Sequence, residues 1–171
     1  MIRLANKNDI GLIAKIYTDS WKKTYKGMLP DDYLDSLSYE HSEEKLLNYI
    51  GVKGQNILVS TDESNKVVAF ASYKPYSEIN KCLLLDSLHV SALYKGIGIG
   101  KELIFKVADF AMNEGYKSMT ISVFKGNYKA ENIYMHLGAK HLNEFIDSFD
   151  GISSESKTFI WEDISILKKS L

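Results

Sequence analysis

Hydrophobic residues recur along the chain with two periods, the spacing of a helix and the alternation of a strand. In the N-terminal part the pattern predicts a strand at 2–5 and helices at 10–25, 31–37 and 43–50. Residues able to cap a helix precede two of these helices: Asn8 or Asp9 before the first, and Ser42 before the last. The chain is therefore expected to begin with one strand and two or three helices.

The rest of the chain alternates strand-like and helix-like segments, and Gly115 and Gly138 stand where two of the helices end. The order is three strands, a helix, a strand, a helix and two strands, which predicts an α/β architecture with one parallel crossover in a single domain, residues 1–171. The expected strands are 55–60, 66–74, 82–90, 117–123, 139–149 and 157–165, and the expected helices follow Gly100 and span 127–137.

A glycine-rich turn joins the apolar segment 82–90 to the helix after it. Gly96, Gly98 and Gly100 occupy every second position of YKGIGIGK. Glycine lets a ligand approach the backbone and permits positive φ, and the first turn of a helix has free N–H groups. Together these features predict a site for a phosphate or pyrophosphate.

Three other interpretations apply to this turn. A Walker A loop requires a glycine at Lys95 and a serine or threonine at Glu102. A dinucleotide-binding motif requires the spacing G-x-G-x-x-G and a later acidic residue, which the segment 120–123 lacks. The last interpretation is a tight turn that binds nothing, although each glycine within a helix costs about 1 kcal/mol of helix propensity.

The segment LHVSALYKGIGIGK resembles the acyl-CoA-binding motif of the GNAT N-acetyltransferase superfamily, Q/R-x-x-G-x-G/A, with Lys95 at the first position. The later segment NYKAENIYMHLGA resembles the family's N-x-x-A-x-x-x-Y-x-x-x-G-F. The resemblance extends over nearly the whole chain. It implies a GNAT-like α/β fold, with a mixed central sheet of about seven strands flanked by about four helices.

By this resemblance the cofactor is acetyl-CoA. The backbone of Leu88 and Val90 would pair with the pantetheine arm, an N–H near Leu88 would polarise the thioester carbonyl, and the small Ala130 would let the arm pass. The implied cofactor-binding residues are Leu88, Val90, Lys95, Gly96, Ile97, Gly98, Ile99, Gly100, Lys101, Asn127, Ala130 and Tyr134.

The resemblance also implies that Tyr134 is the general acid that protonates the departing CoA thiolate. A phenol pKa near 10 and a thiol pKa near 8.5 make this transfer workable. The alternative is a core tyrosine with a satisfied hydroxyl.

The general base is less clearly indicated. Many relatives carry a glutamate where this chain has Leu84, and Asp86 is the nearest substitute; the alternative is that Asp86 only accepts a hydrogen bond at the strand end. In a regular strand Leu84, Asp86 and Leu88 share a face, and His89 lies on the opposite face unless a bulge intervenes.

Trp21 and Tyr25 lie four residues apart on the predicted first helix and share a face. In the GNAT family this region walls the acceptor cleft, so both are candidate substrate-binding residues; the alternative is ordinary core packing. The acidic residues between Asp31 and Glu44 form either a solvated face or a negative rim that attracts cationic amines.

Composition narrows the classes of partner. A formal net charge of −1 without a basic stripe argues against nucleic acid, and the chain has no apolar run long enough for a membrane span. The N-terminus lacks the apolar segment of a signal peptide, and Cys82 is the single cysteine, which excludes an intramolecular disulfide and suits a cytoplasmic protein. The four histidines lack metal-ligand spacing, so we expect no metal.

We therefore expect an acetyl-CoA-dependent N-acetyltransferase that acetylates a primary amine, of a small molecule or a peptide N-terminus, by direct attack on the thioester. One alternative is a non-catalytic acyl-CoA-binding sensor or pseudoenzyme, which the leucine at position 84 favours. The other is a nucleotide-binding α/β domain. The last two strands could form a homodimer. The sequence does not identify the acceptor.

Overall fold

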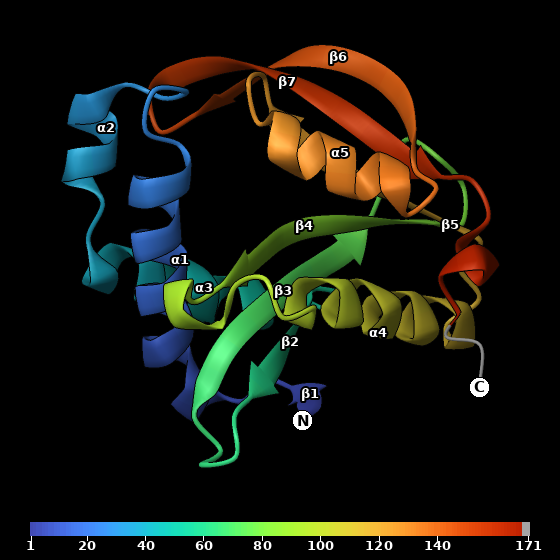
Figure 1. Cartoon of the computed structure of the whole chain (residues 1–171), viewed down its shortest axis with the longest axis horizontal. Helices are drawn as coiled ribbons and strands as arrows, with labels where there is room; N and C mark the ends of the chain where they lie inside the picture. Colours follow the sequence, from blue (N-terminus) through green and yellow to red (C-terminus); the bar gives the residue numbers. More distant parts are fainter. Residues whose placement is uncertain (169–171) are drawn as a thin grey trace.

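Seven strands form one mixed sheet in the computed structural model, which describes residues 1–168 (Figure 1). Their order across the sheet is β1-β2-β3-β4-β5-β7-β6, and β4 and β5 are the parallel pair. The predicted fold class and its single parallel crossover are confirmed. The strands are β1 Ile2–Leu4, β2 Asn56–Thr61, β3 Val67–Pro75, β4 Cys82–Val90, β5 Ser118–Phe124, β6 Lys140–Phe149 and β7 Ile152–Trp161.

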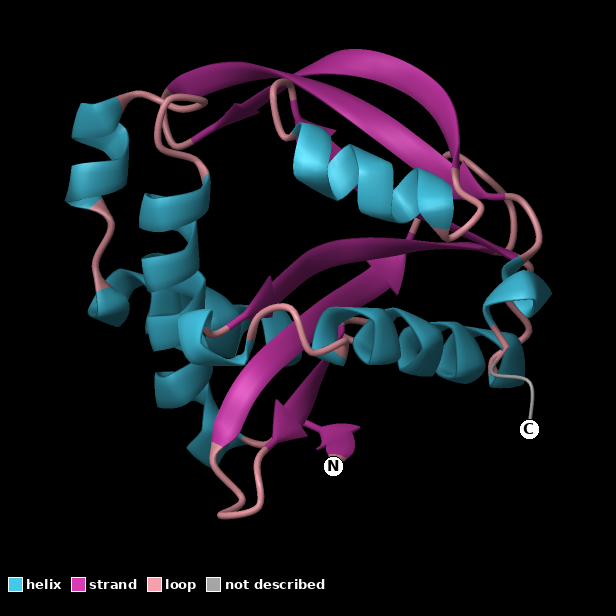
Figure 2. Cartoon of the chain, in the orientation of Figure 1, coloured by secondary structure: helices cyan, strands magenta, loops and turns pink. Residues whose placement is uncertain are grey.

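Helices cover both faces of the sheet (Figure 2). One hydrophobic cluster contains residues of α4 (Ile99–Asn113) and α5 (Tyr128–His136), and a second contains residues of α1 (Ile10–Thr24) and α3 (Tyr39–Ile50). The short α2 (Asp31–Ser36) packs in a third, small cluster with the tip of the β6–β7 hairpin. No helix of residues 1–168 is both long and apolar enough to cross a bilayer.

Successive side chains of β2 and β3 point to opposite faces of the sheet, and this places them in the two different large hydrophobic clusters. Leu58 packs toward α4, whereas Ile57 and Val59 on either side of it pack toward α1 and α3. All three side chains are buried, which is why these strands are apolar on both faces.

The start of one helix differs from the prediction. α3 begins at Tyr39 because Ser38 caps it, accepting a hydrogen bond from the His41 N–H at 3.1 Å. Ser42, the expected cap, is instead buried in the helix and lies 2.7 Å from the Thr18 hydroxyl. At the first helix, Asp9 stands at the N-cap of α1 as expected, although its side chain makes no capping hydrogen bond there, and Asn6 caps the short 3-10 turn before it.

The last strand also differs from its predicted range. It runs over Ile152–Trp161 rather than 157–165, so the serine-rich segment expected as a turn pairs with β6. The turn is the dipeptide Asp150-Gly151, with φ of 49° and 78°, between the paired residues Phe149 and Ile152. Positive φ at both central residues is typical of a two-residue hairpin turn.

Candidate active site

β4 and β5 are neighbours over only part of their length. Their parallel pairing ends where Leu85 lies opposite Ile121. Beyond these residues β4 stays paired with β3, and β5 stays paired with β7. A gap therefore opens between the carboxyl ends of the two central strands.

The backbone of β4 presents free groups to this gap. The Ser91 N–H donates to the Val68 carbonyl in line with β3, at 2.8 Å. Since successive residues of an antiparallel strand direct their backbone groups to opposite sides, the groups of Leu88 and Val90 face away from β3 and toward the gap. This is the strand edge predicted to bind an extended ligand.

A β-bulge in β4 sets the directions of its side chains. Leu85 and Ser87 lie opposite consecutive residues of β3, so Asp86 has no partner across the pair. The bulge shifts the alternation by one residue. Leu88 consequently packs in the same cluster as Leu85, so it does not share a face with Asp86 as it would in a regular strand.

The same bulge turns His89 to the side of α1. Its Nδ1 lies 3.0 Å from the Ser20 hydroxyl, and its ring packs against Tyr17 and Phe70 at centroid distances of 5.6 and 5.5 Å. Burial, with a smaller contribution from the positive charge of Lys95, lowers the pKa of His89 to about 3. The imidazole is therefore neutral at physiological pH.

The glycine-rich turn leads directly into α4. The first helical hydrogen bond runs from the Glu102 N–H to the Gly98 carbonyl at 3.0 Å, so the preceding N–H groups of the first turn lack helical partners. Gly96 and Gly98 have φ of 83° and 92°, which L side chains rarely adopt. Beside the turn, burial and then the positive charges of Lys129 and Lys23 lower the pKa of Lys95. Free N–H groups and gathered ammonium groups favour an anion here.

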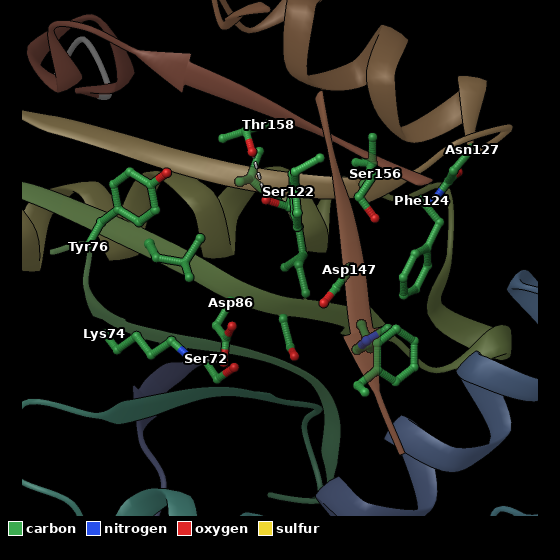
Figure 3. A pocket seen from close by; sticks show the side chains of 18 of the residues that line it. Ser72, Lys74, Tyr76, Asp86, Ser122, Phe124, Asn127, Asp147, Ser156 and Thr158 are labelled. Carbon is green, nitrogen blue, oxygen red and sulfur yellow. Dashed lines mark hydrogen bonds and ion pairs between the residues drawn. The ribbon is translucent and has the colours of Figure 1, made fainter. Parts of the chain in front are cut away.

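A cavity of about 670 Å³ adjoins the gap (Figure 3). The predicted residues Trp21, Tyr25, Asp86, Asn127 and Tyr134 all line it, although they come from α1, β4 and the α5 region. Asn127 caps α5 as expected, accepting from the N–H three residues later at 3.4 Å. The structure thus brings Asp86, the second sequence motif and the aromatic pair at the end of α1 to one cavity, whereas none of residues 95–101 lines it.

Tyr134 reaches this cavity from α5. Its ring packs edge-on against Trp161 at 5.9 Å, and its side chain is buried. Burial, and secondarily the nearby Tyr25, raises the pKa of Tyr134. The phenol is therefore protonated at neutral pH and available as a proton donor.

Asp86 points into the cavity from the bulge (Figure 3). Its carboxylate lies 3.4 Å from the ammonium of Lys74 on β3, and about a third of its side chain (30%) is exposed. The Tyr49 hydroxyl is buried nearby, and burial and then the charge of Asp86 raise the pKa of that phenol. Asp86 therefore has both solvent access and polar neighbours.

The C-terminal hairpin contributes cavity residues that were not predicted from the sequence. Phe145, Asp147 and Phe149 of β6 line the cavity, as does Ser156 of β7. The available signal was the alternation: a carboxylate stands between two aromatic residues on one face of a strand. None of the acidic residues between Asp31 and Glu44 lines the cavity.

Residues 14–139 match the Acetyltransferase (GNAT) family. Over 99% of its length the chain is 31% identical to the uncharacterized N-acetyltransferase YuaI of Bacillus subtilis (strain 168), of which 97% is covered. It is 26% identical to the spermidine N(1)-acetyltransferase of Thermoplasma acidophilum, over 81% of this chain and 87% of the relative. The crystal structure of the PaiA N-acetyltransferase from Thermoplasma acidophilum in complex with coenzyme A has a similar fold, with a TM-score of 0.73 at 23% identity over 92% of this chain and 96% of the other. The chain belongs to the GNAT acetyltransferase family.

Proposed function

We propose that this protein is an acetyl-CoA-dependent N-acetyltransferase whose acceptor is a primary amine. The observation that carries the proposal is the separation of β4 from β5 beyond Leu85 and Ile121. It leaves a free strand edge between a glycine-rich helix start and a cavity of about 670 Å³. Membership of the GNAT family, and a relative named for spermidine, support this function.

The residues around the gap fit acetyl-CoA. The N–H groups from Lys95 to Lys101 suit its pyrophosphate. The backbone of Leu88 and Val90 suits the amides of the pantetheine arm, which would lie along β4 as an added strand. When bound, acetyl-CoA supplies an acetyl group that is activated as a thioester.

Three groups act on the reacting atoms in this proposal. Asp86 removes a proton from the substrate ammonium, directly or through a water molecule. An N–H near Leu88 donates to the thioester carbonyl oxygen. The amine attacks the thioester directly while both reactants are held together, and the Tyr134 hydroxyl donates its proton to the departing sulfur.

The aromatic residues of α1 wall the acceptor side. Trp21 and Tyr25 pack edge-on at 4.9 Å, and both line the cavity. The indole Nε1 of Trp21 is buried without a hydrogen-bond partner among the described residues. A buried donor without a partner costs about 1–3 kcal/mol, so this side of the cavity contains one unsatisfied N–H group.

The test is release of free CoA thiol from acetyl-CoA in the presence of a panel of primary amines. We expect amine-dependent release with at least one amine, and mass spectrometry should find the matching N-acetyl product. Saturable binding of acetyl-CoA without release by any amine would instead support the acyl-CoA-binding sensor. Absence of both binding and release would exclude the proposed function.

A further inference from the structure

Two carboxylates from different strands point into the cavity of about 670 Å³, which is called the acceptor cavity below. Asp86 enters it from the bulge of β4 and Asp147 from β6, and Figure 3 shows both side chains directed into the same space. Asp86 already has a cationic partner, Lys74, at 3.4 Å. The Asp147 carboxylate has neither an ion pair nor a hydrogen bond to any residue among 1–168.

Lys45 offsets the charge of Asp147 only weakly. Lys45 donates to the Tyr17 hydroxyl at 3.4 Å and lies over the Tyr17 ring, 5.7 Å from its centroid. Burial and the charge of Asp86 raise the pKa of Asp147, and Lys45 opposes them with the smallest effect. Asp147 is thus a half-buried carboxylate without an ion-pair partner among residues 1–168.

The charges of the whole cavity show the same imbalance. Four carboxylates line it, and two ammonium groups oppose them. Glu78, Asp86 and Glu144 are exposed, whereas Asp147 is the half-buried member of the four. A ligand with two positive charges would balance the cavity, and a ligand with one would leave a carboxylate unpaired.

The surroundings of Asp147 suit a second ammonium group. The Ser156 hydroxyl is 2% exposed, has no hydrogen-bond partner and points into the cavity, so its oxygen can accept from an ammonium N–H (Figure 3). Phe149 packs edge-on against Trp21 at 5.9 Å, and aromatic faces attract cations and contact methylene chains. An alkyl chain with an amine at each end has these properties.

We propose that the acceptor is an aliphatic diamine or longer polyamine, and that Asp147 binds its second, non-reacting ammonium group while Asp86 faces the amine that is acetylated. This inference rests on the proposed acetyltransferase function and names its substrate class. Asp147 is a specificity-determining residue in it, and no chemical step depends on Asp147.

The experiment compares α,ω-diamines of three to five carbons with monoamines of the same length. Initial rates with acetyl-CoA give kcat and KM, and calorimetric titration into the protein saturated with CoA gives amine affinity without turnover. We expect the best diamine to exceed its matching monoamine about 10-fold or more in affinity, the size of one ion pair with a partly buried carboxylate. The variant Asp147→Asn should lose this preference through KM, with the monoamine unaffected.

The control is Glu155→Gln, which removes an exposed carboxylate from the same hairpin outside the cavity and should leave both amines unchanged. Equal affinity of the wild-type protein for diamine and monoamine would overturn the inference. So would an equal loss of kcat for both amines in Asp147→Asn, since that would make Asp147 part of the chemistry. Failure of acetyl-CoA binding would instead contradict the proposed function. If the wild-type protein binds the diamine but acetylates no amine, and Asp147→Asn abolishes that binding, the result would still support this inference.

Discussion

At the scale of single residues, the proposed chemistry depends on the β-bulge in β4, because it sets the directions of the Asp86 and Leu88 side chains. Asp86 is unpaired across the β3–β4 pair, which lets its carboxylate point into the acceptor cavity while Leu88 returns to the core. No local signal in the sequence separates a bulged strand from a regular one here, because apolar and polar residues are mixed throughout DSLHV. The sequence therefore predicted that Asp86 was a candidate base, but it could not predict its direction.

Replacing Tyr134 tests the assignment of the general acid. Tyr134→Phe keeps the ring packing against Trp161 and removes only the hydroxyl. We expect kcat to fall about 100-fold, the usual size of a lost proton donor, while the affinity for CoA stays within a factor of about two. Steady-state kinetics and calorimetry measure the two quantities, and an unchanged kcat would remove Tyr134 from the mechanism.

His89 predicts a pH-dependent stability. Its folded-state pKa of about 3 is below the unfolded value of about 6.5, so the unfolded chain binds a proton that the folded protein does not. The free energy of unfolding should therefore fall as the pH drops from about 6.5 toward 3, with about 2 kcal/mol lost from this residue by pH 5.

Urea unfolding at pH 7 and pH 5 measures this effect, with His89→Gln as the comparison. Glutamine does not titrate, so the variant should lose less stability than the wild-type protein over the same interval. Equal losses in the two proteins would show that the buried imidazole is protonated in both states.

At the scale of elements, the start of α4 is the part that the sequence predicted best. The glycines at every second position predicted the turn. The apolar helix pattern after them predicted where the helix begins and so where its free N–H groups lie. The start of α3 was predicted less well, because two serines near it could each cap the helix. Ser38 and Ser42 stand four residues apart, and burial of Ser42 against Thr18 decides in favour of the first.

The same turn provides a matched pair of variants. Gly98 and Gly115 flank α4 with φ of 92° and 85°, and a Cβ at either position would meet nothing within 4 Å. Each Gly→Ala change should therefore cost about 1 kcal/mol of unfolding free energy from backbone strain alone.

The two variants should differ in ligand binding. Gly98→Ala places a methyl group where the pyrophosphate is proposed to approach, so its dissociation constant for CoA should rise about 10-fold or more. Gly115→Ala lies at the opposite end of the helix and should bind CoA as the wild-type protein does. Similar CoA affinities in the two variants would mean that this turn does not contact the cofactor.

At the scale of the whole molecule, the order of elements was predictable and the closure of the site was not. The alternation of strands and helices predicted the fold class and the parallel crossover. The acceptor side, however, is completed by the β6–β7 hairpin, whose tip is held to α2 by a hydrogen bond of 2.8 Å from the Tyr33 hydroxyl to Asp150. A contact between residues so far apart in sequence has no local pattern.

The most direct test of the account is calorimetric titration of the purified protein with acetyl-CoA. The free edge of β4, the start of α4 and the adjoining cavity together predict saturable binding of one acetyl-CoA per chain, with a dissociation constant in the micromolar range, on the order of −8 kcal/mol. A titration with no saturable heat up to millimolar acetyl-CoA would contradict the central claim that the gap between β4 and β5 is a cofactor site.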